Sequence, residues 1–130
     1  MFTFDKPVSG ATATITEGTA TATTPTFSGN DVVVNLSGVS DQKYVTIALT
    51  NVASSDGGTG GTGSVRVGFL VGDVNRNRVV TLADLGLVNS QLSQPVTAAN
   101  FLDDVNASGT ITVADKGITN ANLTRALPLP

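Results

Sequence analysis

The 130-residue sequence contains no cysteine, no histidine and no tryptophan. Disulfide bonds are therefore excluded, and so are thiolate or imidazole metal sites and Cys or His nucleophiles. Charged residues make up only 13% of the chain and give a net charge of −3, which disfavours binding to nucleic acid or to an anionic membrane surface. No apolar run approaches the ~20 residues that a membrane-spanning helix needs.

The chain also has no recognisable secretory signal peptide, because strand-like sequence follows Met1 at once. We therefore expect the natural chain to extend upstream. A chain of this length has room for one domain or two small ones, and 40% hydrophobic residues suffice for a modest core. Its richness in Thr, Ser, Asn and Gly is typical of extracellular β-modules.

Residues 1–71 carry β-branched and alternating residues in short runs that turn signals rich in Gly, Ser and Asn separate. The predicted strands cover residues 2–4, 11–16, 19–23, 31–36, 44–52 and 64–71. The Gly-rich segment 56–63 is either a hairpin tip or a flexible loop, and we favour an exposed hairpin tip. This spacing favours an antiparallel β-sandwich of the immunoglobulin-like kind, with one or two strands expected upstream because about seventy residues are few for seven strands.

From Asp73 onward one short unit occurs twice, and the second copy begins 31 residues later, at Asp104. The first copy reads DVNRNRVVTLADLGLVNSQLSQ and the second reads DVNASGTITVADKGITNANLTR, with 9 identities in 22 aligned positions. Chance does not readily produce this agreement, so the chain contains an internal repeat.

Each copy places oxygen-bearing side chains at positions 1, 3 and 5 and an Asp at position 12. This is the alternation of an EF-hand calcium loop, whose seventh residue contributes a backbone carbonyl. The candidate ligands of the first copy are Asp73, Asn75, Asn77, the Val79 carbonyl and Asp84. Those of the second copy are Asp104, Asn106, Ser108, the Thr110 carbonyl and Asp115. Thr81 and Thr112 occupy the position that holds a water.

Two features of the loops predict weak binding. Each loop has only two carboxylates, and position 6, which requires a left-handed backbone, is Gly109 in the second copy but Arg78 in the first. We expect affinities of about 10⁻⁴–10⁻³ M, with the second loop the better site. The alternative is that both loops are Asx-rich turns that cap helices and bind no metal.

Three helices are predicted after residue 72, over residues 81–93, 96–102 and 112–126. Asp84 lies in the first turn of the first of them, where a negative charge is favourable, and Pro95 ends it. Thr97 is a candidate N-cap for the middle helix. On a helical wheel the predicted core face of the first helix consists of Leu82, Leu85, Val88 and Leu92.

These residues resemble a dockerin domain. The resemblance rests on the Gly-Asp-Val-Asn opening at Gly72, the Val-Thr-Leu-Ala-Asp-Leu run from Val80, and duplicated loop-then-helix units without a preceding helix. It implies a calcium-folded module at residues 72–130 that follows an immunoglobulin-like module at residues 1–71. It further implies a secreted bacterial protein that binds a cohesin-like protein domain.

A second stripe of side chains follows both predicted helices and provides a candidate partner-binding face. In the first copy the stripe contains Ala83, Leu87, Ser90 and Gln94, and in the second it contains Ala114, Ile118, Ala121 and Arg125. In dockerins this face, with the preceding residues Leu82 and Val113, docks the cohesin. The alternative is a structural C-terminal tail whose repeats pack on its own β-sandwich without a separate partner.

An enzyme is the least supported class. The acidic residues of the β-part could act as acid and base, but they are scattered over predicted strands and turns without a pairing pattern. These residues are Asp5, Glu17, Asp31, Asp41 and Asp56. We therefore predict a non-catalytic region with no small-molecule substrate.

Overall fold

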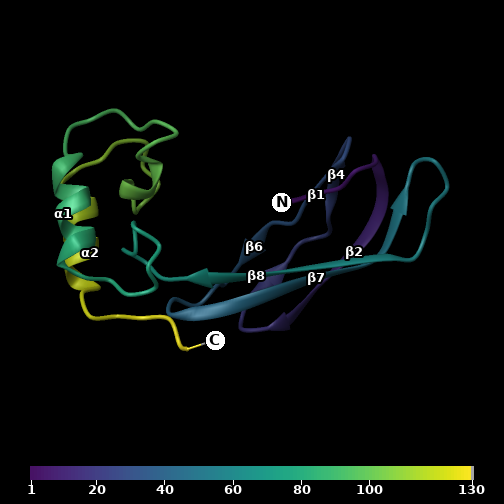
Figure 1. The fold of residues 1–130 in the computed structure, drawn as a ribbon, viewed down its shortest axis with the longest axis horizontal. Helices are drawn as coiled ribbons and strands as arrows, with labels where there is room; N and C mark the ends of the chain where they lie inside the picture. Colours follow the sequence, from purple (N-terminus) through teal and green to yellow (C-terminus); the bar gives the residue numbers. More distant parts are fainter. Residues whose placement is uncertain (130) are drawn as a thin grey trace. The chain divides into compact units, whose positions relative to one another are not determined.

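The computed structural model describes residues 1–129 as antiparallel β sheets followed by a small two-helix region (Figure 1). The predicted mixed architecture of two modules is confirmed. The chain divides into two compact units, Met1–Val67 and Gly68–Pro130, whereas the sequence places the boundary after Val71. No helix among the described residues is long and apolar enough to cross a membrane.

Residues 2–69 form three antiparallel sheets, so the last strand extends two residues past the boundary at Val67. One has the strand order β1-β5-β4, the second β2-β7-β8 and the third β3-β6. The strands are β1 (Phe2–Thr3), β2 (Val8–Glu17), β3 (Thr21–Ala22), β4 (Thr26–Ser28), β5 (Asp31–Val33), β6 (Leu36–Ser37), β7 (Lys43–Ser54) and β8 (Gly61–Phe69). The predicted strand 31–36 is two short strands in different sheets, and β4 was not predicted.

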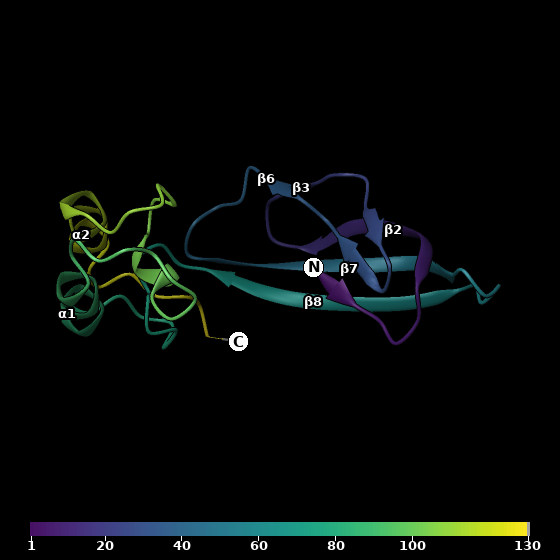
Figure 2. The ribbon, with the colours of Figure 1, turned by 90° about the horizontal axis from the view of Figure 1, so that it is seen from above.

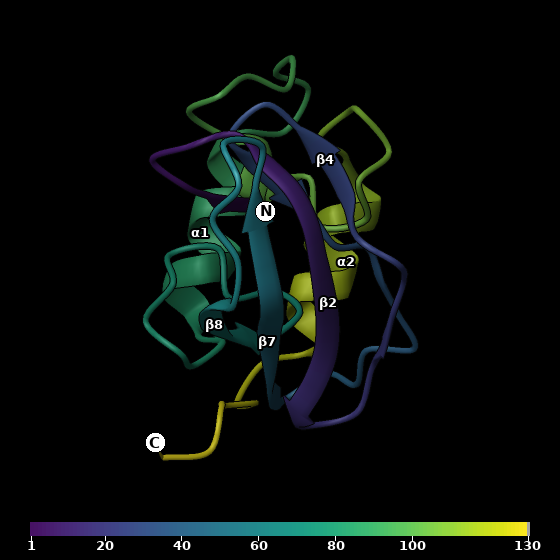
Figure 3. The same ribbon diagram turned by 90° about the vertical axis from the view of Figure 1, so that its right-hand side faces the viewer.

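The longest pairing joins β2 to β7, which lie side by side in Figure 3. Ala13 lies opposite Leu49 and Ile15 opposite Ile47, so β-branched and aliphatic residues share one face of this pair. The core of the unit consists of Val8, Val32, Leu49 and Val52, with Phe2, Phe4, Ala11, Ala13 and Val34 packed against it. The exposed turn between β7 and β8 agrees with the predicted hairpin tip.

The second unit contains α1 (Leu82–Ser90), the short 3₁₀ helix η1 (Phe101–Asp103) and α2 (Val113–Ala121). Both α-helices end earlier than predicted, and the predicted helix 96–102 is a turn followed by η1. Thr97 does cap that turn, since its hydroxyl accepts the Ala99 N–H at 3.3 Å.

The buried cluster of this unit consists of Val74, Val88 and Ile111, against which Val96, Leu102 and Val105 pack. The prediction that Leu82 belongs to the core face of α1 is wrong, because its side chain is 73% exposed. Leu82 is the first residue of the helix, and the buried side chain in this first turn is that of Asp84. Leu85 and Leu92 are half-buried.

Candidate metal centre

Each repeat begins its helix with the same pair of caps. Thr81 precedes α1 and accepts the Ala83 N–H, while the Asp84 carboxylate accepts the Thr81 N–H at 2.8 Å. Thr112, Ala114 and Asp115 make the same bonds at α2. The Thr-x-Ala-Asp run therefore forms a capping box in both copies.

The Asp at position 12 also reaches back into its own loop. The Oδ1 atom of Asp84 accepts the Asn75 N–H at 3.2 Å, and that of Asp115 accepts the Asn106 N–H at 3.2 Å. Both carboxylates are fully buried. Each one thus joins position 3 of the loop to the first turn of the helix, so loop and helix form one structural unit.

The carboxylate of the Asp at position 1 accepts hydrogen bonds from the backbone N–H groups of positions 5 and 6. Asp73 accepts from Asn77 at 3.0 Å and from Arg78 at 2.8 Å. Asp104 accepts from the N–H of Ser108 at 2.9 Å and of Gly109 at 2.7 Å. The two loops therefore fold around their first carboxylate in the same way.

The side chains at positions 3 and 5 complete the loops. The amide oxygens of Asn75 and Asn106 each accept the N–H of position 5 at 3.0 Å. Position 5 itself differs between the copies. Asn77 accepts the Val79 N–H at 2.9 Å, whereas the Ser108 hydroxyl donates to the Thr110 carbonyl at 3.1 Å.

The backbone conformations of the loops match as well. Position 6 is left-handed in both, with φ +74° at Arg78 and φ +87° at Gly109. Position 4 is also left-handed, with φ +62° at Arg76 and φ +54° at Ala107. Only position 6 therefore differs in backbone cost, since glycine adopts this conformation without strain and arginine does not.

Each loop forms a β-bridge with the segment that follows the helix of the other repeat. Val79, at position 7, bridges to Ala126, and Thr110 bridges to Pro95. These bridges are symmetric, because Pro95 and Ala126 occupy the same place in their copies. The residue expected to contribute a carbonyl ligand is thus held by the opposite repeat.

Further cross-repeat bonds flank these bridges. The Thr124 N–H donates to the Val80 carbonyl at 2.9 Å, and the Ser93 N–H at the equivalent place donates to the Ile111 carbonyl at 3.0 Å. Ser93 and Thr124 both have a left-handed backbone. This turn explains why α1 and α2 end early: the chain must turn back to reach the other loop.

Gly72, immediately before the first loop, is required by close packing. Its φ is +97°, and a Cβ at this position would lie 3.3 Å from the Thr119 Cα and 3.3 Å from a methyl of Val80. A side chain would be tight against the backbone of α2 and would also have to adopt a left-handed backbone, so both the space and the φ angle favour glycine at this position of the first copy.

At position 12 of the second loop, hydrogen bonds to the carboxyl of Asp115 outweigh the effect of its burial on the pKa. Burial raises the pKa of the Asp115 carboxyl, whereas N–H donors from Thr112 and Asn106 and the Thr112 hydroxyl lower it, and the net effect places the pKa below its usual range. The carboxylate form is therefore favoured. Outside the loops, burial raises the pKa of Asp103.

The donor set of each loop suits a hard cation, because it consists only of carboxylate, amide, hydroxyl and carbonyl oxygens. Among residues 1–129 no three acidic side chains come together, so each loop would rely on two carboxylates with neutral oxygens. An oxygen that accepts one N–H retains a lone pair for a cation. The residues thus fit Ca²⁺ in type, with a low count of negative charges.

Most of the predicted partner-binding side chains are exposed. Leu82 and Val113, at equivalent positions, are 73% and 77% exposed, and Leu87 is 45% exposed. Ala83, Ser90, Gln94, Ala114, Ala121 and Arg125 are also exposed. Ile118 is half-buried and contributes less to this surface than its counterpart Leu87.

One polar contact between the helices was not anticipated from the sequence. Lys116 of α2 donates to the Asn89 amide oxygen of α1 at 2.7 Å. The position equivalent to Lys116 in the first copy is Leu85, so this contact has no symmetric counterpart. Only the departure from the repeat, Leu to Lys, could have drawn attention to it.

Comparisons with known proteins identify no relative. Neither the protein-family models, nor the curated proteins, nor the solved structures contain a match to this chain.

Proposed function

We propose that the second unit is a dockerin-like module that binds two Ca²⁺ ions and docks onto a cohesin-like domain of another protein. The region as a whole is non-catalytic and belongs to a secreted bacterial protein. The observation that carries this proposal is the pair of oxygen-lined loops. In each loop two backbone N–H groups donate to the Asp at position 1, and the Asp at position 12 is buried.

The chemistry of the loops supports a cation as ligand. In both copies the carboxylates of positions 1 and 12 accept bonds from neutral N–H groups, which orient them without cancelling their charge. A bound Ca²⁺ would neutralise the negative charge that these carboxylates retain and would link the loop to its helix. The residues that would hold it are those predicted from the sequence, from Asp73 to Asp84 and from Asp104 to Asp115.

The exposed side chains of α1 and α2 support a separate partner. Leu82 and Val113 begin their helices at equivalent positions, and each is largely exposed. Large exposed apolar residues at symmetric sites provide a docking face, and burial of one such side chain contributes about 1.5–3 kcal/mol. Because the copies are related by symmetry, either one offers a partner nearly the same surface.

The experiment compares Leu82→Asp, Val113→Asp and the double variant for binding to a panel of purified cohesin domains in millimolar calcium. Circular dichroism verifies that each variant remains folded, which is expected because both side chains are exposed. If either copy can dock, each single variant retains binding and the double variant loses it. If all variants bind like the parent, another surface docks. If the parent binds no cohesin, the helices belong to a structural tail and the proposed partner is wrong.

A further inference from the structure

Lys116 is the only charged side chain of α1 and α2 that is not fully buried. The two helices carry three charged residues, and the other two are the buried Asp84 and Asp115. The Lys116 Nζ donates to the Asn89 Oδ1 of α1 at 2.7 Å, so the ammonium group lies between the two helices, which are seen side by side in Figure 2. Asn89 is exposed and follows Leu82 by two helical turns, so the ammonium group lies on the side of the helices that carries the docking face.

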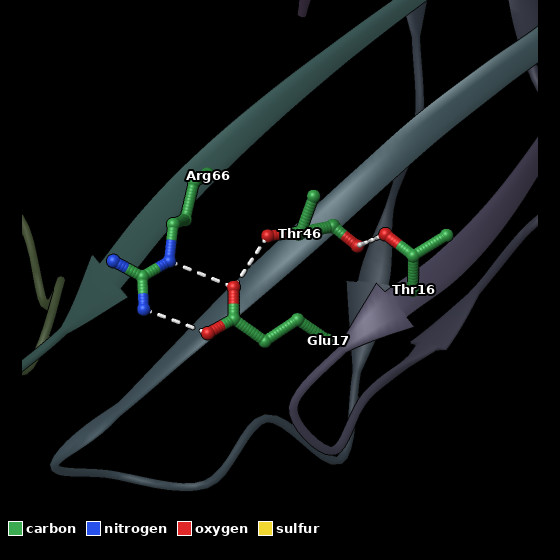
Figure 4. Close-up of polar contacts among 4 residues, drawn as sticks. All are labelled: Thr16, Glu17, Thr46 and Arg66. Carbon is green, nitrogen blue, oxygen red and sulfur yellow. Dashed lines mark hydrogen bonds and ion pairs between the residues drawn. The ribbon is translucent and has the colours of Figure 1, made fainter. Parts of the chain in front are cut away.

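The Lys116 ammonium group has no counter-ion. Among residues 1–129 no carboxylate forms an ion pair with it, and it donates instead to a neutral amide oxygen. In the β unit, by contrast, the Arg66 guanidinium donates to both carboxylate oxygens of Glu17 at 2.7 Å (Figure 4). Lys6 likewise pairs with Asp56 at 2.7 Å. Because an ammonium group has three N–H donors, Lys116 retains its positive charge and two donors for a partner.

Lys116 also lies close to the pseudo-two-fold axis that relates the two copies. The symmetric β-bridges described above place the start of each helix beside the end of the other, so α1 and α2 run antiparallel. Exchange of the copies converts the contact of Lys116 with Asn89 into one of Leu85 with Asn120. In an antiparallel pair these two places are one helical turn apart, about 6 Å, and the axis passes midway between them. The ammonium group is therefore about 3 Å from the axis, measured along the helices.

We propose that Lys116 contacts the docked partner in both of its orientations and selects partners that present a carboxylate opposite the middle of the two helices. The proposal rests on the dockerin-like function above. Half a turn of the partner about the axis shifts the ammonium group by only about 6 Å relative to it, which the flexible four-carbon stem of a lysine accommodates. Arg125, by contrast, follows the end of α2 and its counterpart is the neutral Gln94, so it meets opposite ends of the partner in the two orientations.

Charge complementarity is the reason for a carboxylate. A partner that covers an unpaired ammonium group without an acceptor of its own must remove water from that charge, so it binds weakly. The Asn89 amide oxygen satisfies one donor but does not neutralise the charge. A partner carboxylate does both. Because the two helices carry no other charged side chain outside the buried interior, Lys116 alone distinguishes partners by charge at the middle of this face.

Isothermal titration with the panel of cohesin domains tests the proposal in two backgrounds. Leu82→Asp and Val113→Asp each leave one docking orientation, and Lys116→Leu is added to both. This substitution installs the residue of the first copy, Leu85, so the helices should remain folded, as circular dichroism verifies. Lys116→Leu should weaken binding about 10-fold in either background. A loss in one background only, or in neither, would overturn a contact made in both orientations.

Two further variants separate the charge contact from other effects. Lys43→Leu removes an exposed lysine of the β unit and should bind like the parent, and a loss equal to that of Lys116→Leu would show that net charge acts rather than position. Lys116→Arg keeps the charge and should retain binding. Raising the salt from about 50 to about 500 mM should weaken the parent more than Lys116→Leu, because salt screens the charged contact. A parent that binds no cohesin contradicts the dockerin-like function itself, whereas a parent that binds as tightly as Lys116→Leu contradicts only the role of Lys116.

Discussion

The two compact units use their carboxylates in opposite ways. In the β unit the exposed carboxylates of Asp56 and Glu17 pair with cationic side chains, Lys6 and Arg66, each at 2.7 Å. In the repeat unit Asp73, Asp84, Asp104 and Asp115 accept from backbone N–H groups. A carboxylate beside a guanidinium or ammonium is already neutralised, whereas one held by peptide groups retains its full charge. A bound cation is therefore expected in the second unit and not in the first.

A second difference lies between the copies of the repeat. The hydrogen bonds of positions 1, 3 and 12 and the left-handed backbone of positions 4 and 6 agree, although position 6 is Arg78 in one copy and Gly109 in the other. The fold thus imposes the left-handed turn whatever the residue, and the first copy bears the strain. Each copy also depends on the other through the segments after the helices. Substitutions in one copy, or in one unit, therefore leave its counterpart as the control.

The largest effect is expected from the buried carboxylates at position 12. Asp84→Ala removes the acceptor of the Asn75 and Thr81 N–H groups and one half of the capping box, so it should destabilise the repeat unit by about 3 kcal/mol. Asp115→Ala should cost the same, because its bonds are equivalent. Urea unfolding followed by helical circular dichroism measures both. Asp5→Ala, at an exposed site of the β unit, is the control.

A smaller effect is expected where the segment after α2 is hydrogen-bonded to the first loop. The Leu127 N–H donates to the Arg78 carbonyl at 3.0 Å, and Leu127→Pro deletes this donor. The variant should lose about 1–2 kcal/mol of stability, and calcium binding should weaken at the first loop only. Leu129→Pro is the control, since the Leu129 N–H makes no backbone bond to another described residue. Equal losses from both prolines would indicate a general effect on the C-terminal segment rather than the loss of one bond.

The strain at position 6 should be worth about 1 kcal/mol. Arg78→Gly relieves it, because the backbone there has φ +74°, and should stabilise the repeat unit and tighten the first loop for calcium. The reciprocal change, Gly109→Arg, should destabilise the second loop by a similar amount. Isothermal titration with calcium and urea unfolding compare the two. If Arg78→Gly leaves both unchanged, position 6 does not distinguish the loops.

The smallest effect concerns the ion pair of the β unit. Hydrogen bonds from Arg66 and then from Thr46 lower the pKa of Glu17 from 4.5 to about 2. A carboxyl whose pKa is lower in the folded state stabilises that state above pH 4.5, and this contribution is lost as the pH falls from about 4.5 to 2. Because the pair is exposed, solvent screening reduces its contribution. Tyr44 is the only tyrosine and its fluorescence follows urea unfolding. Glu17→Gln should make that unfolding less dependent on pH over this window.

The local geometry of both loops was predictable from the sequence because it depends on residues close together in the chain. The Thr-x-Ala-Asp run alone specifies the capping box. The EF-hand pattern of the repeat predicts a left-handed backbone at position 6, and the φ of +74° at Arg78 agrees with it. The class of fold was predictable for a similar reason, since strand and helix patterns are confined to different segments.

The features that depend on distant contacts were not predictable. The helix ends are set by the left-handed turns at Ser93 and Thr124, which exist because the chain pairs with the opposite repeat. Strand β4 is only three residues long and directly follows Pro25, so it gave no periodic signal. A helical wheel places Leu82 in the core because it counts only apolar residues. It does not show that a carboxylate, that of Asp84, is the buried side chain in this turn.

We propose that the repeat unit binds calcium and that the β unit does not. Thermal unfolding in 10 mM calcium and in EDTA tests it, with helical circular dichroism reporting on α1 and α2 and Tyr44 fluorescence reporting on the β unit. For a dissociation constant of about 1 mM, calcium should add about 1.4 kcal/mol per site and raise the helical midpoint by several degrees. The Tyr44 midpoint should stay the same, and magnesium should have a smaller effect. Identical helical midpoints in calcium and in EDTA would contradict calcium binding by the repeat unit.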